Sequence, residues 1–223
     1  YNIDELKQLF EFEQPEEAFA KAYLTWGNTF ADKFNGDFAA VIIDFIQQTV
    51  LLVRDHIGVR PLTYSIKDDL LVFASHEFGI AKSNLVDNSL SYSSLIRTFF
   101  YTSNIQKYNL TVFQNINKVI PGYLLKIDSD QKYYKYWEPE KIKIDHNLTF
   151  EVAVCQIRKL LVRSVKIRVN KGTIGAHVSG GLDSSGVAAI LADNLHDKGC
   201  LKCFSWSPKE SAIKIGALNE KEF

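Results

Sequence analysis

One stretch of the 223-residue chain combines glycines, hydroxyls and a carboxylate at a spacing suited to binding phosphate groups. Residues 172–178 are mostly small or apolar, residues 186–192 are apolar, and S-G-G-L-D-S-S stands between them, from Ser179 to Ser185. This pattern predicts a strand, a glycine turn and a helix. Such an arrangement aims backbone N–H groups and the positive end of the helix dipole at one point. The stretch therefore predicts an anion-binding site.

The residue types in this turn narrow the anion to a metal-bound polyphosphate. Gly180 and Gly181 let the backbone approach a phosphate closely, and the serine hydroxyls add donors. Asp183 would repel a phosphate unless a cation such as Mg²⁺ lies between them, so we expect Asp183 to be a metal ligand. The residues expected to bind the polyphosphate are Val178, Ser179, Gly180, Gly181, Leu182, Asp183, Ser184 and Ser185.

Two common nucleotide-binding motifs do not fit this turn, and a plainer interpretation exists. The Gly-Lys-Ser/Thr ending of the P-loop is missing, and the glycine spacing is not that of the dinucleotide-binding motif. In the plainer interpretation the glycines only cap an ordinary helix, with Asp183 or Ser185 as its N-cap.

Composition describes a globular chain without signs of a nucleic-acid or membrane partner. Hydrophobic residues make up 46%, charged residues 23%, and the net charge is zero. No apolar run has the length of a membrane span, and no signal peptide is visible. The chain begins with Tyr1 and contains no Met, which we interpret as an internal fragment of a longer protein.

The three cysteines favour free thiols and a cytoplasmic protein. Their number is odd and nothing indicates secretion. Cys200 and Cys203 form a C-x-x-C pair, which could be a redox pair or half a zinc site. No second such pair or His pair stands nearby, so we interpret them as two small residues near a strand.

The first 137 residues read as helices followed by closely spaced strands. We expect helices over 2–10, where Asn2 and Glu5 resemble a capping box, and over 14–26, 75–82 and 90–101. Strands separated by such short links pair antiparallel. The expected strands cover residues 38–45, which should be buried on both faces, and 49–54, 62–66, 70–74, 112–118, 123–127 and 132–137.

Residues 138–149 are polar, contain a proline, and are expected to link two domains. An amphipathic helix is expected over 150–168. The strand, turn and helix of the phosphate-binding stretch follow it, with a further strand at 201–207. Strand, helix and strand in this order predict a parallel βαβ unit. The residues expected on the apolar stripe of the first helix are Val152, Cys155, Leu160, Leu161 and Val165.

Several motifs together resemble one enzyme family. They are F-N-G-D-F-A from Phe34, R-D-H-I-G-V-R-P-L-T-Y from Arg54, F-A-S-H-E from Phe73, and S-G-G-L-D-S-S from Ser179. The last is similar to the pyrophosphate loop of ATP pyrophosphatases. The combination resembles the glutamine-dependent asparagine synthetases and their relatives, the β-lactam synthetases and lasso-peptide cyclases, over nearly the whole chain.

The resemblance implies an α+β domain followed by an α/β domain. Residues 1–137 would be a type 2 glutamine amidotransferase domain that lacks its N-terminus, an antiparallel αββα sandwich of the Ntn-hydrolase type. Residues 138–149 would be the linker. Residues 150–223 would begin a parallel-sheet ATP-pyrophosphatase domain of the asparagine synthetase kind, truncated in this chain.

The resemblance also implies a reaction: aspartate is activated by ATP as an acyl adenylate and amidated by ammonia, which glutamine or solution supplies. ATP and Mg²⁺ are the implied cofactors, and a homodimer is an option. Trp206 stands where the family has an apolar residue near the adenine. The catalytic Cys is expected before Tyr1, and the synthetase site would be completed beyond Phe223, so we expect these 223 residues alone to be inactive.

One departure from the family leaves the glutaminase activity open. The family often has a Ser-Asp pair that binds the amino group of glutamine, and here Gln14 and Pro15 occupy that register. Two other functions therefore stay open, an amide- or macrolactam-forming cyclase without glutaminase activity and a non-catalytic nucleotide-binding scaffold. Arg54 and Asp55 are expected to fix a turn rather than to act on a substrate.

Overall fold

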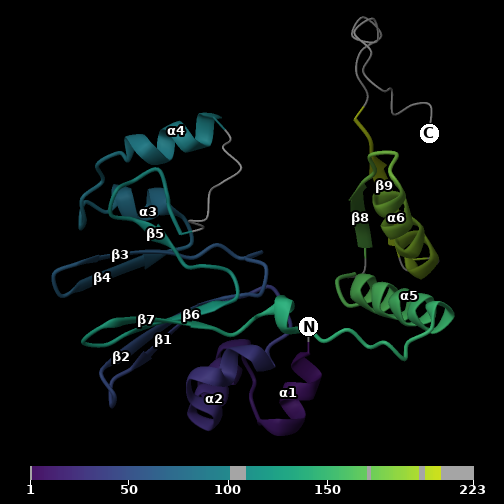
Figure 1. Ribbon diagram of the computed structural model, residues 1–223, viewed down its shortest axis with the longest axis horizontal. Coiled ribbons are helices and arrows are strands. Elements are labelled where there is room, and N and C mark those ends of the chain that lie inside the picture. Colours follow the sequence, from purple (N-terminus) through teal and green to yellow (C-terminus); the bar gives the residue numbers. More distant parts are fainter. Residues whose placement is uncertain (1, 101–108, 170–171, 196–198, 207–223) are drawn as a thin grey trace, which may run out of the picture. The chain divides into compact units, whose positions relative to one another are not determined.

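The computed structural model describes residues 2–100, 109–169, 172–195 and 199–206, and the chain forms two compact units, Tyr1–Lys143 and Ile144–Phe223 (Figure 1). Each unit is described by itself below. No helix among the described residues is long and apolar enough to cross a membrane. The division into residues 1–137, 138–149 and 150–223 stays a prediction.

Two antiparallel sheets form the centre of the first unit. One sheet has the order β1 (Ala39–Asp44), β2 (Thr49–Arg54), β6 (Tyr123–Ile127) and β7 (Gln131–Lys135). The other has the order β4 (Leu70–Ala74), β3 (Thr63–Lys67) and β5 (Asn117–Lys118). The predicted hairpins β1–β2 and β3–β4 are confirmed. The strand expected over 112–118 is shorter in the structure, because only Asn117 and Lys118 form β5.

Helices cover the outer faces of these two sheets, so the unit has four layers (Figure 1). Next to the first sheet lie α1 (Ile3–Leu9), α2 (Pro15–Trp26) and the 3₁₀ helix η1 (Gly27–Lys33). On the side of the second sheet lie α3 (Glu77–Lys82) and α4 (Tyr92–Phe100). The short 3₁₀ helix η2 (Pro139–Lys141) follows β7.

Strand alternation explains why β2 is buried on both faces. Successive side chains of a strand point to opposite faces of its sheet. Leu51 and Val53 therefore pack against the helices α1, α2 and η1, whereas Leu52 packs between the two sheets with Leu125 and Tyr64. Burying one such leucine contributes about 2 kcal/mol.

The prediction that residues 38–45 are buried on both faces is wrong. β1 is an edge strand that pairs only with β2 in its sheet, and Ile43 is 49% exposed. Phe45, in the turn that follows, is 86% exposed. An apolar composition alone does not distinguish a central strand from an edge strand, because the difference depends on which distant strands pair with it.

Side-chain hydrogen bonds fix several connections in this unit. The Asn2 side chain does not cap α1. It donates to the Lys33 carbonyl at 2.8 Å and accepts from the Asn35 amide at 2.9 Å, which joins the start of α1 to the end of η1. The capping box predicted from Asn2 and Glu5 is therefore wrong at Asn2.

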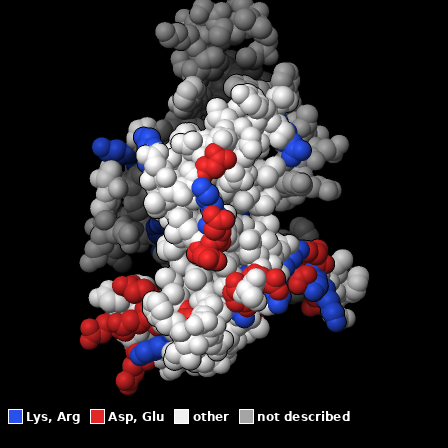
Figure 2. All heavy atoms as spheres, turned by 90° about the vertical axis from the view of Figure 1, so that its left-hand side faces the viewer, with Lys and Arg blue, Asp and Glu red and all other residues white. Residues whose placement is uncertain are grey.

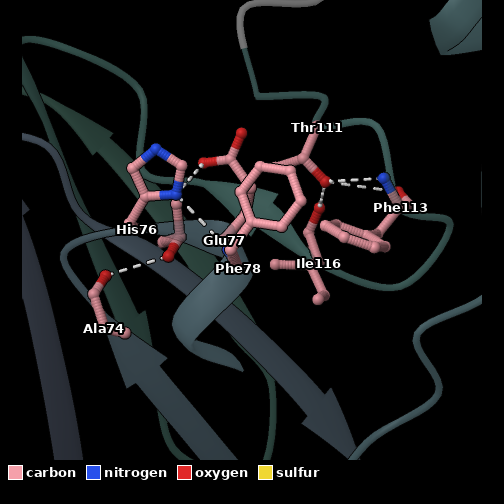
Figure 3. A network of polar contacts seen from close by, with 8 residues as sticks. Ala74, His76, Glu77, Phe78, Thr111, Phe113 and Ile116 are labelled. Atoms are coloured by element: carbon pink, nitrogen blue, oxygen red, sulfur yellow. Dashed lines mark hydrogen bonds and ion pairs between the residues drawn. The ribbon is translucent and has the colours of Figure 1, made fainter. Parts of the chain in front are cut away.

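A second group of hydrogen bonds surrounds the start of α3 (Figure 3). The Phe78 amide donates to Nδ1 of His76 at 3.4 Å, so His76 caps the helix. The Thr111 hydroxyl donates to the Ile116 carbonyl at 2.6 Å and accepts from the Phe113 amide at 3.1 Å. These bonds hold the loop that packs Phe113 and Ile116 against α3.

The hairpin turns at one end of the sheets carry charges of both signs. Lys126 pairs with Asp128 at 3.0 Å, and the turn between β3 and β4 contains Asp68 and Asp69. The view in Figure 2 shows basic and acidic side chains close to each other on this face. Mixed signs at short range do not build a large field of one sign.

The second unit is built from α5 (Phe150–Lys166), β8 (Gly172–His177), α6 (Leu182–Leu195) and β9 (Gly199–Phe204). β8 and β9 are parallel, with Gly172 opposite Gly199 and His177 opposite Phe204, so the predicted βαβ unit is confirmed for the described residues. The two units together show the expected mixed α/β fold. The predicted end of the last strand at Ser207 lies outside the described residues.

The apolar stripe predicted on α5 is only partly buried. Of its five residues Val165 is buried, whereas Val152, Cys155, Leu160 and Leu161 are exposed. The helix begins at Phe150, as predicted. The Thr149 hydroxyl caps this end, because it accepts a hydrogen bond from the Val152 amide at 3.4 Å.

Candidate functional site

The predicted phosphate-binding stretch begins where the parallel pair of strands ends. After β8, the Val178 amide donates to the Phe204 carbonyl at 2.8 Å and extends the pairing by one residue. Ser179 is the next residue and leads into the turn. Ligands of parallel α/β sheets bind at the carboxyl ends of the strands, which is where this turn lies.

The backbone of the turn needs glycine and ends in a helix N-terminus. Gly180 has a φ of 79°, a left-handed conformation that other residues rarely adopt. The Ser185 amide donates to the Gly181 carbonyl at 3.2 Å, the first bond of the helical pattern. The amides just before it have no helical partner by geometry, and they point along the axis of the 14-residue helix α6. The turn can therefore bind an anion.

Three serine hydroxyls lie in the turn in different settings. The Ser179 and Ser184 hydroxyls are 3.2 Å apart, and the Ser184 hydroxyl also lies 3.3 Å from the Gly181 carbonyl. The Ser179 amide donates to the Ser184 hydroxyl at 3.2 Å. Ser179 and Ser185 are exposed, whereas Ser184 is half-buried.

Asp183 is exposed in the first turn of α6, where a negative charge is favourable. Among the described residues, no group of three His, Cys, Asp or Glu side chains could hold a metal ion. A single carboxylate still fits Mg²⁺, which usually keeps water and phosphate oxygens as its other ligands. The donor set suits a magnesium ion that arrives with a polyphosphate.

The structure brings residues 178–185 together in one turn and places Trp206 just after β9. Because β8 and β9 are parallel, the ends of both strands lie at the same edge of the pair. Trp206 is 77% exposed and Leu182 is 89% exposed. The Phe204 ring lies over Gly175, where an added Cβ would be 3.4 Å from it. Which of these side chains contact a ligand stays a prediction.

Cys200 and Cys203 do not form a redox pair in this structure. Both are free and exposed on β9. Residues three apart on a strand point to opposite faces, so the two thiols lie on different sides of the sheet. The interpretation of the pair as two small strand residues agrees with this placement.

In the first unit, the side chains of Asp55 and Arg54 form hydrogen bonds with the backbone of the loop of residues 55–60. The buried Asp55 carboxylate accepts hydrogen bonds from the amides of Val59 at 2.9 Å, Arg60 at 2.8 Å and Ile57 at 3.3 Å. These bonds organise residues 55–60.

Arg54 holds the same loop and a neighbouring turn through its guanidinium group. It donates to the carbonyls of Gly58 at 2.7 Å, Arg60 at 2.8 Å and Val119 at 3.1 Å. Burial lowers the pKa of Arg54, and the nearby Asp55 charge opposes that shift. The pair fixes a turn, as the sequence predicted.

His56 packs against the two aromatic residues that follow β7. Its ring lies edge-on to Trp137, with centroids 4.8 Å apart, and to Tyr136 at 5.4 Å. Burial lowers the pKa of His56, and the charges of Asp55 and Asp32 oppose the shift. Burial also raises the pKa of Tyr136, whose hydroxyl donates to the Arg54 carbonyl.

A cavity of about 270 Å³ lies beside α1 and α2 in the first unit. Pro15, at the first position of α2, is part of its wall, so this position offers the cavity no carboxylate. The other lining residues are Asn2, Leu6, Ala18, Phe19, Phe34, Asn35, Gly36, Asp37, Phe38 and Arg60.

Residues 1–137, which include all the strands of the first unit, match the family model described as glutamine amidotransferase domain. This match covers more than half of the 223 residues, and the chain belongs to that family. Residues 156–212, which include the phosphate-binding turn, match the model described as asparagine synthase. The two matches lie in the order that the predicted resemblance to the glutamine-dependent asparagine synthetases requires, so that resemblance is confirmed.

The curated relatives include an amidase and an asparagine synthetase. Amidase chyE of Penicillium rubens is 28% identical over 203 residues, which are 86% of this chain and 29% of that protein. Asparagine synthetase [glutamine-hydrolyzing] 3 of Bacillus subtilis is 25% identical over 208 residues, 89% of this chain and 33% of that protein. The chain thus spans about a third of the length of these relatives.

A solved glutamine phosphoribosylpyrophosphate amidotransferase from B. subtilis aligns with 98% of this chain and 49% of its own, at 15% identity and a TM-score of 0.38. The family assignment rests on the sequence matches.

The sequence did not predict which partners the side chains of Ser184 and Asn2 contact. It treated the serines of the turn as equivalent donors, although Ser184 bonds within the turn. It also missed the bridge that Asn2 forms to residues 33 and 35. No local pattern indicates either contact, because each depends on the path of the backbone around a turn.

Proposed function

We propose that the protein containing this chain is an ATP-dependent amide-forming enzyme that converts L-aspartate to L-asparagine. A carboxylate oxygen of aspartate attacks the α-phosphorus of ATP, the bond to the β-phosphate breaks, and pyrophosphate leaves. Ammonia then attacks the carbonyl carbon of the acyl adenylate, and AMP leaves. The observation that carries the proposal is the glycine–serine–aspartate turn between β8 and α6, in a segment that matches asparagine synthase.

The residues of the turn have distinct roles in this proposal. The backbone amides of residues 180–183 and the hydroxyls of Ser179, Ser184 and Ser185 bind the β- and γ-phosphates and stabilise the charge on departing pyrophosphate. Asp183 would hold Mg²⁺, which supplies positive charge against the phosphate oxygens. Trp206, exposed at the end of β9, offers an aromatic face to the adenine.

The first unit would supply ammonia by hydrolysing glutamine. The match to the glutamine amidotransferase family and the name of the Bacillus relative support this role. A second candidate is a related amide- or macrolactam-forming enzyme without glutaminase activity. Pro15 favours it, because position 15 of the chain brings no carboxylate to the cavity wall, and the family often has an acid in this register that binds the amino group of glutamine. The name of the Penicillium relative also fits an enzyme with a different substrate.

The test is pyrophosphate release by the complete protein with ATP, Mg²⁺ and L-aspartate, in which glutamine and ammonium chloride are compared as nitrogen sources. We expect release to require aspartate. Glutamine-driven release supports the first unit as a glutaminase, whereas release with ammonia alone favours the second candidate. Nucleotide binding without pyrophosphate release under any condition would leave only a nucleotide-binding scaffold.

A pair of variants on α6 tests the turn itself. Asp183→Asn removes the carboxylate proposed to hold Mg²⁺, and we expect a loss of about 100-fold in the rate of pyrophosphate release. Asp193→Asn changes an exposed carboxylate near the other end of the same helix and should leave the rate unchanged. Equal rates for the two variants would contradict the role given to Asp183.

A further inference from the structure

β7 (Gln131–Lys135) is an edge strand of the sheet β1–β2–β6–β7, and all of its residues are exposed. It pairs with β6 on one side, and no described strand lies on its other side. Its register with β6 is continuous from Tyr123 opposite Lys135 to Ile127 opposite Gln131, and β7 contains no proline. An edge of this kind presents a row of free backbone groups to a further strand.

Hydrogen bonds just beyond the two ends of β7 show which of its backbone groups point toward β6. The Tyr136 amide donates to the Gly122 carbonyl at 3.0 Å, and the Asp128 amide donates to the Asp130 carbonyl at 3.0 Å. Even-numbered residues on either side of β7 thus bond inward. Because bonded residues alternate along an antiparallel strand, the even-numbered residues within β7 also face β6. The amides and carbonyls that point outward belong to the odd-numbered residues Gln131, Tyr133 and Lys135.

Two copies of β7 are complementary to each other in one antiparallel register. When Tyr133 of one copy lies opposite Tyr133 of the other, Gln131 lies opposite Lys135, and Lys132 lies opposite Tyr134. All the outward residues of both copies then pair, which gives about six backbone hydrogen bonds. No two charges of the same sign lie directly opposite, and tyrosine packs beside tyrosine at the centre.

The two neighbouring registers are less favourable. A register centred on Lys132 places this lysine opposite its own copy, and equal charges directly opposite destabilise a strand pair. A register centred on Tyr134 places Gln131 opposite Trp137, whose amide is turned inward and donates to the Gly122 carbonyl at 3.2 Å. Lysines on an edge strand usually oppose pairing. On β7 they favour the register centred on Tyr133.

The central residue of this register is already fixed in a single copy. The Tyr133 hydroxyl oxygen lies 2.5 Å from that of Tyr64, which is buried on β3 of the other sheet. This hydrogen bond joins the middle of β7 to the second sheet. Less conformational freedom is therefore lost when β7 pairs with a further strand.

We propose that the β7 edge is a dimer interface, at which the β7 strands of two copies of this chain pair antiparallel around Tyr133 and join their sheets into one. The interface lies in the first unit and does not rest on the function proposed for the turn after β8. Because so short an edge is a small interface, we expect a dissociation constant of about 10–100 μM.

Gln131 and Gln47 give a matched set of variants. Gln131 would lie opposite Lys135 of the other copy, whereas Gln47 is exposed in the turn between β1 and β2. Gln131→Lys places equal charges opposite each other at two symmetric positions, and Gln131→Glu places opposite charges there. Gln47→Lys and Gln47→Glu make the same changes of net charge away from β7. The readout is the dissociation constant of the complete protein in analytical ultracentrifugation at low salt.

We expect Gln131→Lys to weaken the dimer about tenfold and Gln131→Glu to tighten it about tenfold, and both effects should shrink at about 0.5 M salt. The two Gln47 variants should match the wild type. Hydrogen exchange is the second readout. The amides of Gln131, Tyr133 and Lys135 should exchange more slowly as the protein concentration rises, whereas those of Lys132 and Tyr134, which face β6, should not change.

Three results would overturn the inference. The first is a complete protein that stays monomeric at about 500 μM, and the second is an equal dissociation constant for the two Gln131 variants. The third is concentration-dependent protection of the amides of β1, the other edge of the sheet, instead of those of β7. None of these measurements needs ATP or a substrate, so their outcome is independent of whether the protein releases pyrophosphate.

Discussion

Asp55 offers the sharpest test of how the first unit holds its shape. Its side chain is 1% exposed, and its carboxylate accepts hydrogen bonds from the amides of Val59, Arg60 and Ile57. Asp55→Asn keeps the size of the side chain but replaces one acceptor oxygen with an NH₂ group. That group would face backbone donors, so at least one hydrogen bond is lost. Asp55→Ala removes all three.

The expected loss of stability follows from the two shortest hydrogen bonds to the Asp55 carboxylate, from the amides of Val59 and Arg60. A hydrogen bond from a backbone amide to a carboxylate contributes about 1.5–3 kcal/mol. Asp55→Asn should therefore lower the free energy of unfolding by about 1.5–3 kcal/mol. Asp55→Ala should lower it by about 3–5 kcal/mol, because it removes all three hydrogen bonds. Both losses are large against the 5–15 kcal/mol by which domains of this kind are usually stable.

The assay is urea unfolding of the chain, followed by the fluorescence of Trp26 and Trp137 in the first unit, with Trp206 replaced by phenylalanine. Asp69→Asn is the matched control, because Asp69 is exposed in the turn between β3 and β4. We expect this variant to change the free energy of unfolding by less than about 0.5 kcal/mol. The reasoning is refuted if Asp55→Asn costs no more than the control.

Three further predictions concern the same unit and the exposed thiols. Gly58→Ala should destabilise the first unit by at least about 1–2 kcal/mol in urea unfolding, because Gly58 has a φ of 74° and an added Cβ would lie 2.6 Å from Pro121. Burial lowers the pKa of His56 below its ordinary 6.5, so the unfolded state binds more protons near that pH. The free energy of unfolding should fall as the pH is lowered through 6.5, and His56→Gln should show a smaller fall in the same titration. Cys200 and Cys203 should both react with a thiol reagent under native conditions and form no disulfide with each other, which mass spectrometry after mild oxidation would check.

Local patterns predicted most of the regular elements of the first unit. β2 (T-V-L-L-V-R) and the β3–β4 hairpin were identified from β-branched and apolar runs separated by short turns, and α2 from Pro15 at its start and Gly27 at its end. These signals are local, so they need no knowledge of the rest of the fold. The edge position of β1 is different, since it depends on the pairing of β2 with β6, more than 70 residues later.

Amphipathic patterns likewise predict a helix better than they predict its burial. The spacing of Val152, Leu161 and Val165 correctly indicated α5, because one apolar face requires a period of 3.6 residues. Of these three side chains, only Val165 is buried among the described residues. Periodicity reports which side chains share a face, whereas burial also requires a partner surface.

In the candidate site, too, the sequence predicted which residues lie together but not which atoms are in contact. Spacing in the sequence was enough to gather Ser179, Asp183 and Ser184 at the start of one helix, because a glycine turn between a strand and a helix leaves little choice of path. It could not assign the contacts of the hydroxyls. The 3.2–3.3 Å contacts of Ser184 exist only because Gly180 turns the backbone back toward α6. Two neighbouring serines of one motif therefore differ in their contacts: Ser184 bonds within the turn and is half-buried, whereas Ser185 is exposed.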